Sequence, residues 1–292
     1  MRPFRFGLLF ITTLGGLACV ALADCGGDAF SGSDGADDGS RPDVTADGMV
    51  PQDGIADAGQ DGASDAMVLS DGCPLGATSS MVRINIPANL SDASFYCIDS
   101  TEVSNGQYQA FLAAKMGNTS GQIPACSWNT VYTPDCCWPN QANNPVFHVD
   151  WCDAYTYCAH RGLRLCGGVA GGTAQFDMPR ATEWYNACSK LGERDYPYGL
   201  AFDPAACNGP EGGAPAPPAT FPACVGPYPL LFDLSGNVAE WEDGCSSKDQ
   251  TAECPARGGF YDSDEFGLTC LSLARLPKMT RAPWVGFRCC RG

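Results

Sequence analysis

Cysteine is the residue type that most constrains this 292-residue chain. Of its 18 cysteines, Cys19 and Cys25 lie near the N-terminus and sixteen follow from position 73 onward. An even number in an exported chain is typical of a disulfide framework, so we expect eight disulfides of undetermined pairing. Zinc is disfavoured because no Cys-x-x-Cys pair occurs and the chain has only two histidines. The sixteen are Cys73, Cys97, Cys126, Cys136, Cys137, Cys152, Cys158, Cys166, Cys188, Cys207, Cys224, Cys245, Cys254, Cys270, Cys289 and Cys290.

The N-terminus predicts export. Arg2 and Arg5 precede an apolar run over residues 7–23, which is the pattern of a secretory signal peptide over residues 1–23. Either Cys19 or Cys25 is a candidate for lipid attachment, which would anchor the chain to a membrane through its N-terminus. The expected location is therefore the cell envelope, as a lipoprotein, or the secreted fraction.

Residues 24–72 predict a disordered acidic linker. Between Asp24 and Asp71 there are twelve Asp residues and one basic residue, Arg41. A segment this polar cannot bury enough apolar surface to offset the entropy of ordering it. Because phosphate binding needs clustered Lys and Arg, the acidity also excludes nucleic acid as a partner.

Residues 73–292 predict one folded domain with a full core. Residues 81–87 alternate as a half-buried strand does, and residues 147–149 are expected to form another strand. Three short helices are expected: one begins at Ser104 in a capping box with Gln107, one begins at Asp150, and one follows Pro179. Few helices, short strands and many disulfides favour an α+β domain of irregular topology.

The order of several short motifs carries more information than any one of them. Residues 98–111 (Ile-Asp-Ser-Thr-Glu-Val-Ser-Asn-Gly-Gln-Tyr-Gln-Ala-Phe) resemble the E-V-T-N-x-x-Y-x-x-F opening of the formylglycine-generating enzyme family, also called the sulfatase-modifying factor domain. Six further segments resemble later motifs of that family in order, covering nearly all of residues 81–291: 144–158 (P-V-x-x-V-S-W-x-D-A-x-x-Y-C), 164–165 with 179–184 (R-L-P-T-E-A-E-W, split by an insertion), 196–199 (F/Y-P-W-G), 233–241 (D/N-x-x-G-N-V-x-E-W), 257–259 (R-G-G-S) and 286–289 (G-F-R-C).

The resemblance implies a fold and a calcium site. The fold is the irregular, C-type-lectin-like α+β domain of that family, with little regular secondary structure. The family binds calcium in the loop matched by residues 233–241, which places side-chain ligands at Asp233 and Glu240 and carbonyl ligands at Gly236 and Val238. These are all hard oxygen donors, which suit calcium. Of a second calcium site in the family, only Asn208 has a visible counterpart.

The catalytic pair implied by the resemblance is missing. Family enzymes oxidise a substrate cysteine to formylglycine with oxygen, using two cysteines and copper(I) just after R-G-G-S. Those positions fall on Ser263 and Leu268 here, and neither can replace a thiolate on copper(I). Cys270 could supply one thiolate after a small gap, but a disulfide is its simplest role. A three-histidine iron site is excluded by the presence of only His148 and His160, unless a carboxylate substitutes for an imidazole.

The sequence therefore favours a domain that has lost the oxidase chemistry. Its expected role is a calcium-stabilised binding or structural module at the cell surface, with a protein or a glycan as partner and no copper. The alternative is an oxygen-dependent formylglycine-generating oxidase acting on exported proteins, with Cys270 as a catalytic residue.

Overall fold

The computed structural model describes residues 72–73, 80–135, 138 and 141–292 of the chain. All of these lie in one compact unit, Gln60–Gly292, whereas the second unit, Met1–Gly59, contains none of them. The predicted signal peptide, the candidate lipidation sites Cys19 and Cys25, and residues 24–71 of the predicted linker lie outside the described residues. In the described ranges no helix has both the length and the apolar character needed to span a bilayer.

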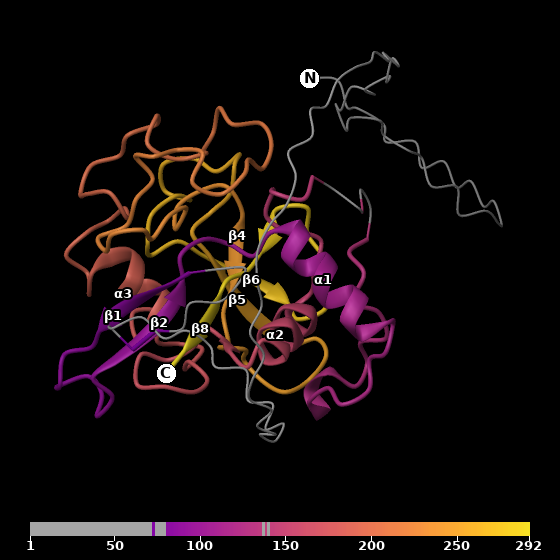
Figure 1. Ribbon diagram of the computed structural model, residues 1–292. Coiled ribbons are helices and arrows are strands. Elements are labelled where there is room, and N and C mark those ends of the chain that lie inside the picture. Colours follow the sequence, from indigo (N-terminus) through magenta and orange to yellow (C-terminus); the bar gives the residue numbers. More distant parts are fainter. Residues whose placement is uncertain (1–71, 74–79, 136–137, 139–140) are drawn as a thin grey trace, which may run out of the picture. The chain divides into compact units, whose positions relative to one another are not determined.

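Short elements joined by long connections make up this unit, so the expected irregular α+β fold with little regular secondary structure is confirmed (Figure 1). In chain order the elements are β1 (Met81–Asn85), β2 (Phe95–Asp99), α1 (Asn105–Lys115), the 3-10 helix η1 (Pro124–Cys126), α2 (Trp151–His160), β3 (Arg164–Leu165), α3 (Glu183–Ser189), β4 (Ala239–Trp241), β5 (Glu253–Arg257), β6 (Leu273–Pro277), β7 (Val285–Gly286) and β8 (Cys289–Arg291).

Side-chain caps fix where the helices begin. Ser104 accepts a hydrogen bond from the backbone of Gln107, whose side chain accepts one from the Ser104 backbone, completing the capping box predicted for α1. Asp150 and Asp153 form the same reciprocal box at α2. Thr182 caps α3, so this helix begins after Pro179 as predicted. All three predicted helices are confirmed.

The predicted strand at residues 147–149 is wrong. Its central residue, His148, has φ 59°, which is the left-handed region and incompatible with an extended strand. The imidazole Nδ1 lies 3.2 Å from the carbonyl oxygen of Arg281, and the residue is 9% exposed. The histidine therefore has a buried structural role in a turn between Pro145 and α2.

Two four-stranded sheets organise the unit. The first has the order β1-β2-β8-β3, so the C-terminal strand lies between β2 and β3, two strands from much earlier in the chain. The second has the order β6-β5-β4-β7, in which β4 runs antiparallel to β5 and parallel to β7. The short β4 is thus surrounded by strands on both sides, and it carries Glu240.

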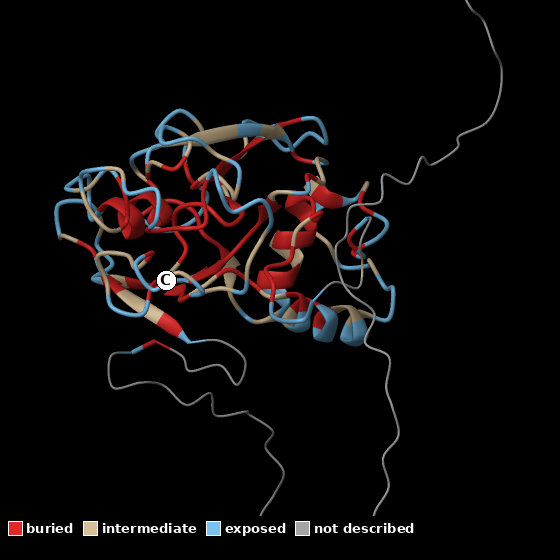
Figure 2. Cartoon of the chain, turned by 90° about the horizontal axis from the view of Figure 1, so that it is seen from above, coloured by how far each residue is buried: buried red, intermediate tan, exposed pale blue. Residues whose placement is uncertain are grey.

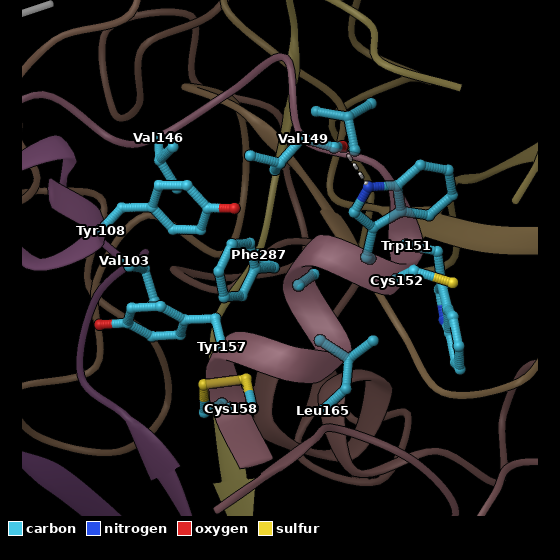
Figure 3. Packing of buried hydrophobic residues seen from close by; sticks show 14 of the residues in the cluster. Val103, Tyr108, Val146, Val149, Trp151, Cys152, Tyr157, Cys158, Leu165 and Phe287 are labelled. Carbon is cyan, nitrogen blue, oxygen red and sulfur yellow. Dashed lines mark hydrogen bonds between the residues drawn. A yellow bond between two sulfur atoms is a disulfide. The ribbon is translucent and has the colours of Figure 1, made fainter. Parts of the chain in front are cut away.

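The main core lies between α1, α2 and β7. Tyr108 and Phe111 of α1 pack against Tyr157 of α2, and Phe287 follows β7 into the same cluster (Figure 3). The Tyr108 and Tyr157 ring centroids are 5.6 Å apart, and those of Tyr157 and Phe287 are 5.2 Å apart. Figure 2 shows the buried residues gathered in the interior of the unit and the exposed residues on its loops.

Seven disulfides connect the described residues, so the predicted disulfide framework is confirmed in kind. The predicted eighth would need Cys136 and Cys137, which lie outside the described residues. Cross-links in this number are typical of proteins that fold in an oxidising environment. The pairs are Cys73–Cys97, Cys126–Cys152, Cys158–Cys289, Cys166–Cys290, Cys188–Cys270, Cys207–Cys224 and Cys245–Cys254.

Candidate functional site

The loop of residues 231–238, which leads into β4, has an unusual backbone. Asp233, Gly236 and Asn237 all have positive φ values, of 57°, 77° and 59°. A Cβ atom on Gly236 would lie 2.1 Å from the backbone oxygen of Asn208, so only glycine fits at this position. These bends bring the loop against the segment around Asn208 and direct the chain into β4, where Glu240 lies.

Glu240 is held by a buried ion pair. Arg288 Nε lies 2.6 Å from Glu240 Oε2, and Arg288 Nη2 lies 2.7 Å from Oε1. The indole nitrogen of Trp184 donates a further hydrogen bond to Oε2 at 2.8 Å. Both partners of the ion pair are about 1% exposed or less, so this bidentate contact is made with water excluded. Arg288 is therefore a buried ion-pair partner.

Two more carboxylates lie in the field of this ion pair. Glu102 is 1% exposed, and its Oε1 accepts a hydrogen bond from Asn237 Nδ2 at 2.9 Å. Glu102 Oε2 is buried with no hydrogen-bond partner. Asp233 Oδ2 accepts a hydrogen bond from the Ala219 backbone at 2.5 Å. Three carboxylates therefore share one guanidinium, which leaves an excess of buried negative charge when all are ionised.

The pKa values reflect this excess. Burial raises the pKa of Glu102 well above its usual value, and the nearby charges of Asp233 and Glu240 raise it further, against the lowering effect of Arg288. Burial also raises the pKa of Asp233, to about 6, although its backbone hydrogen bond and Arg288 oppose the shift. A nearby cation would favour the ionised forms of both carboxyl groups and lower their pKa values.

The donor set fits a hard cation in part. Asp233 and Glu240 lie in one electrostatic cluster with the unsatisfied oxygen of Glu102. In the described part of the chain, no group donates a hydrogen bond to the carbonyl oxygens of Gly236 and Val238. Glu240, however, already accepts three hydrogen bonds, so it has little remaining capacity as a ligand. Glu102, which is absent from the set predicted from the sequence, has the freer oxygen.

None of the residues at or near the positions expected to carry copper thiolates presents a thiolate. Ser263 is half-buried, and its hydroxyl accepts a hydrogen bond from the Phe260 backbone at 2.9 Å. Leu268 is 2% exposed and packs in the interior. Cys270 is 1% exposed and is disulfide-bonded to Cys188, so in this oxidised form it has no thiolate.

One further cluster has the composition of a metal site. Cys166, Glu183 and Cys290 have ligand atoms within 4.8 Å of one another. The two cysteines form a disulfide with each other, and the Glu183 carboxylate binds both Nη atoms of Arg164. A disulfide offers no thiolate ligand, so this cluster is a structural cross-link.

A comparison with protein families identifies the scaffold. The model of the sulfatase-modifying factor enzyme 1-like domain matches residues 55–292. The chain belongs to this family. The expectation drawn from the order of motifs along the sequence is thereby confirmed at the level of the family.

Individual members of the sulfatase-modifying factor family resemble parts of the chain. A mouse (Mus musculus) protein named inactive C-alpha-formylglycine-generating enzyme 2 is 31% identical over 130 residues, which are 41% of this chain and 38% of the relative. The mouse formylglycine-generating enzyme is 27% identical over 132 residues, which are 41% of this chain and 32% of that enzyme. The chain thus matches only about a third of the length of these curated relatives.

Among solved structures, CarF covers 73% of this chain and 98% of its own, with 20% sequence identity and a TM-score of 0.49. PvdO from Pseudomonas aeruginosa covers 73% of this chain and 91% of its own, with 18% sequence identity and the same TM-score.

Sequence reasoning missed part of the family loop's surroundings. It named Asp233 and Glu240 but neither Glu102 nor the link through Asn237. A signal was present, because Glu102 is the glutamate of the first family motif, E-V-T-N. Its part in the charge cluster depends on the approach of β2 to the loop, which the local sequence does not encode.

Proposed function

We propose that this chain is an exported, calcium-stabilised binding or structural module of the cell surface that lacks the oxidase chemistry of its family. The observation that carries the proposal is the state of the catalytic positions. Ser263 and Leu268 occupy the sites where the family places its thiolates, and the Cys188–Cys270 disulfide removes the nearest substitute. The name of the mouse relative, an inactive formylglycine-generating enzyme 2, supports the same assignment. Export is supported by the N-terminal sequence and by the number of disulfides.

The proposed calcium site uses the residues of the family loop. Asp233 would supply side-chain oxygens, and Glu240 would add only the capacity that its three hydrogen bonds leave. Gly236 and Val238 would supply carbonyl oxygens, and Glu102 is added here because of its unpartnered oxygen. A bound calcium ion would supply positive charge to the buried carboxylates and hold the loop against β4. Its role in the proposal is structural, and no redox chemistry is assigned to it.

Added calcium is expected to raise the melting temperature by roughly 5–10 °C at a hundredfold excess over Kd, because binding only the folded state contributes about 2.7 kcal/mol. Asp233→Ala should abolish this rise, measured by differential scanning fluorimetry after chelation. Asp262→Ala is the matched control, since Asp262 is an exposed aspartate elsewhere on the same unit. A rise that is equally large in Asp233→Ala would remove Asp233 from the site.

The calcium effect should also depend on pH. The folded-state pKa of Asp233, about 6, lies above its unfolded value, so without calcium the folded state holds this proton more tightly and stability falls as pH rises through about 6. Calcium competes with the proton and needs the carboxylate. The rise in melting temperature should therefore be larger at about pH 7.5 than at about pH 5. An equal rise at both pH values contradicts ligation by Asp233.

The native, unreduced protein is expected to bind no copper(I). Competition against a chromophoric copper(I) chelator measures this directly, and peptide mapping without reduction should recover the linked Cys188–Cys270 peptides. The alternative function, an active formylglycine-generating oxidase, is favoured by the similarity to the mouse formylglycine-generating enzyme. One equivalent of bound copper(I) that is lost in Cys270→Ser would establish the oxidase reading and overturn the proposed one.

A further inference from the structure

A cavity lies away from the loop of residues 231–238 and from the positions of Ser263 and Leu268. Its volume is about 460 Å³, which is within the usual range of small-molecule sites. It forms where η1, the first turns of α2, the segment after β4 and the end of β6 meet. The residues that line it are Ile123, Pro124, Ala125, Trp151, Tyr155, Thr173, Asp243, Cys245, Ser247, Lys248 and Lys278.

One wall of the cavity is apolar and aromatic. Trp151 and Tyr155 lie one helical turn apart on α2 and stack with their ring centroids 5.0 Å apart. The Trp151 indole nitrogen donates to the carbonyl oxygen of Glu242 at 2.9 Å, which fixes the orientation of the indole ring. Ile123 and Pro124 extend this apolar surface. The Lys278 ammonium lies over the Trp151 ring, 5.1 Å from its centroid, so the face left for a flat apolar ligand is that of Tyr155.

Next to the aromatic residues the cavity presents separate donors and acceptors. Lys278 is 1% exposed, and its Nζ has one long hydrogen bond, 3.4 Å, to the carbonyl oxygen of Ser247. An ammonium group has three donors, so apart from its cation–π contact with the Trp151 ring it can still donate two hydrogen bonds. Asp243 Oδ2 accepts from the Thr173 hydroxyl at 3.0 Å, and no described group donates to Oδ1. Lys278 and Asp243 form no ion pair with each other in the described residues, although each is affected by the charge of the other.

The pKa shifts of Lys278 and Asp243 reflect the burial of both charged groups in the cavity. Burial lowers the pKa of Lys278, against the effects of Asp249 and Asp243. Burial likewise raises the pKa of Asp243, against its hydrogen bond from Thr173 and the charges of Arg164 and Lys278. Both groups still have hydrogen-bonding capacity, two donors on the Lys278 ammonium and Oδ1 on the partly exposed Asp243. A ligand that accepts from the ammonium group and donates to the carboxylate would use both.

Disulfides hold both walls in place. Cys126 of η1 is bonded to Cys152, the neighbour of Trp151 on α2. Cys245 lines the cavity and is bonded to Cys254 of β5. A site whose walls are covalently fixed loses little conformational entropy when a ligand binds.

We propose that this cavity binds a saccharide, with a pyranose ring lying on Tyr155 and its hydroxyl groups reaching Asp243 and Lys278. Each hydroxyl both donates and accepts, so neighbouring hydroxyls can satisfy a carboxylate and an ammonium group together. The ring is neutral, so it adds no charge to a cavity lined by Asp243, Lys248 and Lys278, and its hydroxyls can serve both kinds of charged group. Because polar groups extend along a whole wall from Thr173 to Lys248, several hydroxyls suit it better than the two charged ends of an amino acid. The inference rests on the proposed binding role and names its ligand class.

Binding of the methyl glycosides of glucose, galactose, mannose and N-acetylglucosamine, in both anomers, tests this site. Saturation-transfer NMR and titration of the tryptophan fluorescence are the readouts, and free amino acids form a parallel panel. At least one glycoside should bind. Asp243→Asn should weaken it about tenfold or more, since a hydrogen bond to a charged group is lost. Lys278→Met should do the same, whereas the exposed Asp262→Asn should leave binding unchanged.

Absence of glycoside binding at millimolar concentrations, or equal binding by Asp243→Asn, would overturn the inference. Amino-acid binding in place of glycoside binding would overturn it as well. Asp243→Asn keeps the shape and the Thr173 contact, and its melting temperature confirms folding. The titrations are made with calcium and with chelator. No glycoside binding alongside a normal calcium-dependent rise in melting temperature refutes the saccharide site alone, whereas glycoside binding without that rise refutes only the calcium proposal.

Discussion

Replacing Arg288 by methionine is expected to lower the free energy of unfolding by about 3–5 kcal/mol, the usual cost of breaking a buried ion pair from one side. The substitution leaves the Glu240 carboxylate, 1% exposed, without the two hydrogen bonds that it accepts from the guanidinium. It also removes donors from the carbonyl oxygens of Asp99 and Phe232. Chemical denaturation with intact disulfides, followed by tryptophan fluorescence, measures the loss.

A double-mutant cycle separates the ion pair from the loss of packing. Glu240→Gln in the Arg288→Met background removes the uncompensated charge, so part of the stability should return. Arg288→Lys should not restore the stability of the unmodified protein, because an ammonium group cannot make the bidentate contact with Glu240 or reach the carbonyl oxygens of both Asp99 and Phe232. A matched comparison is Arg275→Met, since Arg275 is exposed and contacts Phe176, through a 3.4 Å hydrogen bond to its carbonyl oxygen and across its ring. A loss for Arg288→Met no larger than that for Arg275→Met would contradict the role assigned to the ion pair.

Local signals in the sequence predict the elements of this fold well. The capping box at Ser104 and the cap at Asp150 are encoded within four residues, and both helices begin where the sequence places them. The strand β1 lies inside the alternating segment 81–87. The loop before β4 is equally legible, because Gly236 lies where a Cβ would meet the backbone of another segment. The two helix starts are determined by short-range caps, and the bend at Gly236 is marked in the sequence by the glycine itself.

The parts that the sequence does not predict depend on contacts between distant segments. His148 appears in an apolar stretch, but its bond to the carbonyl of Arg281 belongs to a turn and not to a strand. Glu102 and Asp233 become neighbours only when β2 meets the loop. Asp243 and Lys278 line one cavity although they lie in different segments, so no spacing rule connects them. The pairing of the cysteines likewise depends on contacts between distant segments, so the sequence does not predict it.

Removal of the two disulfides at β8 is expected to cost more than the sum of the single removals. Cys289 and Cys290 are adjacent on β8, so their side chains lie on opposite faces, and they bond to Cys158 and Cys166. While one bridge is intact, the other closes an effective loop of only about 10 residues, so each single pair replaced by alanine should cost about 3 kcal/mol.

When the second bridge is removed after the first, no other bridge at β8 remains. The shortest loop that this second bridge closed then runs along the chain and through the Cys188–Cys270 disulfide. That loop has about 50 residues, and closing it is worth about 4 kcal/mol, so the double removal should cost about 7 kcal/mol, roughly 1 kcal/mol beyond additivity. The free energies of unfolding of the unmodified protein, the two single-disulfide variants and the double variant, measured by chemical denaturation, complete this cycle. An additive result would mean that each bridge acts on its own face of β8, through packing around its sulfur atoms. A superadditive result means that the two bridges are redundant, because either one alone keeps the C-terminal strand β8 between β2 and β3.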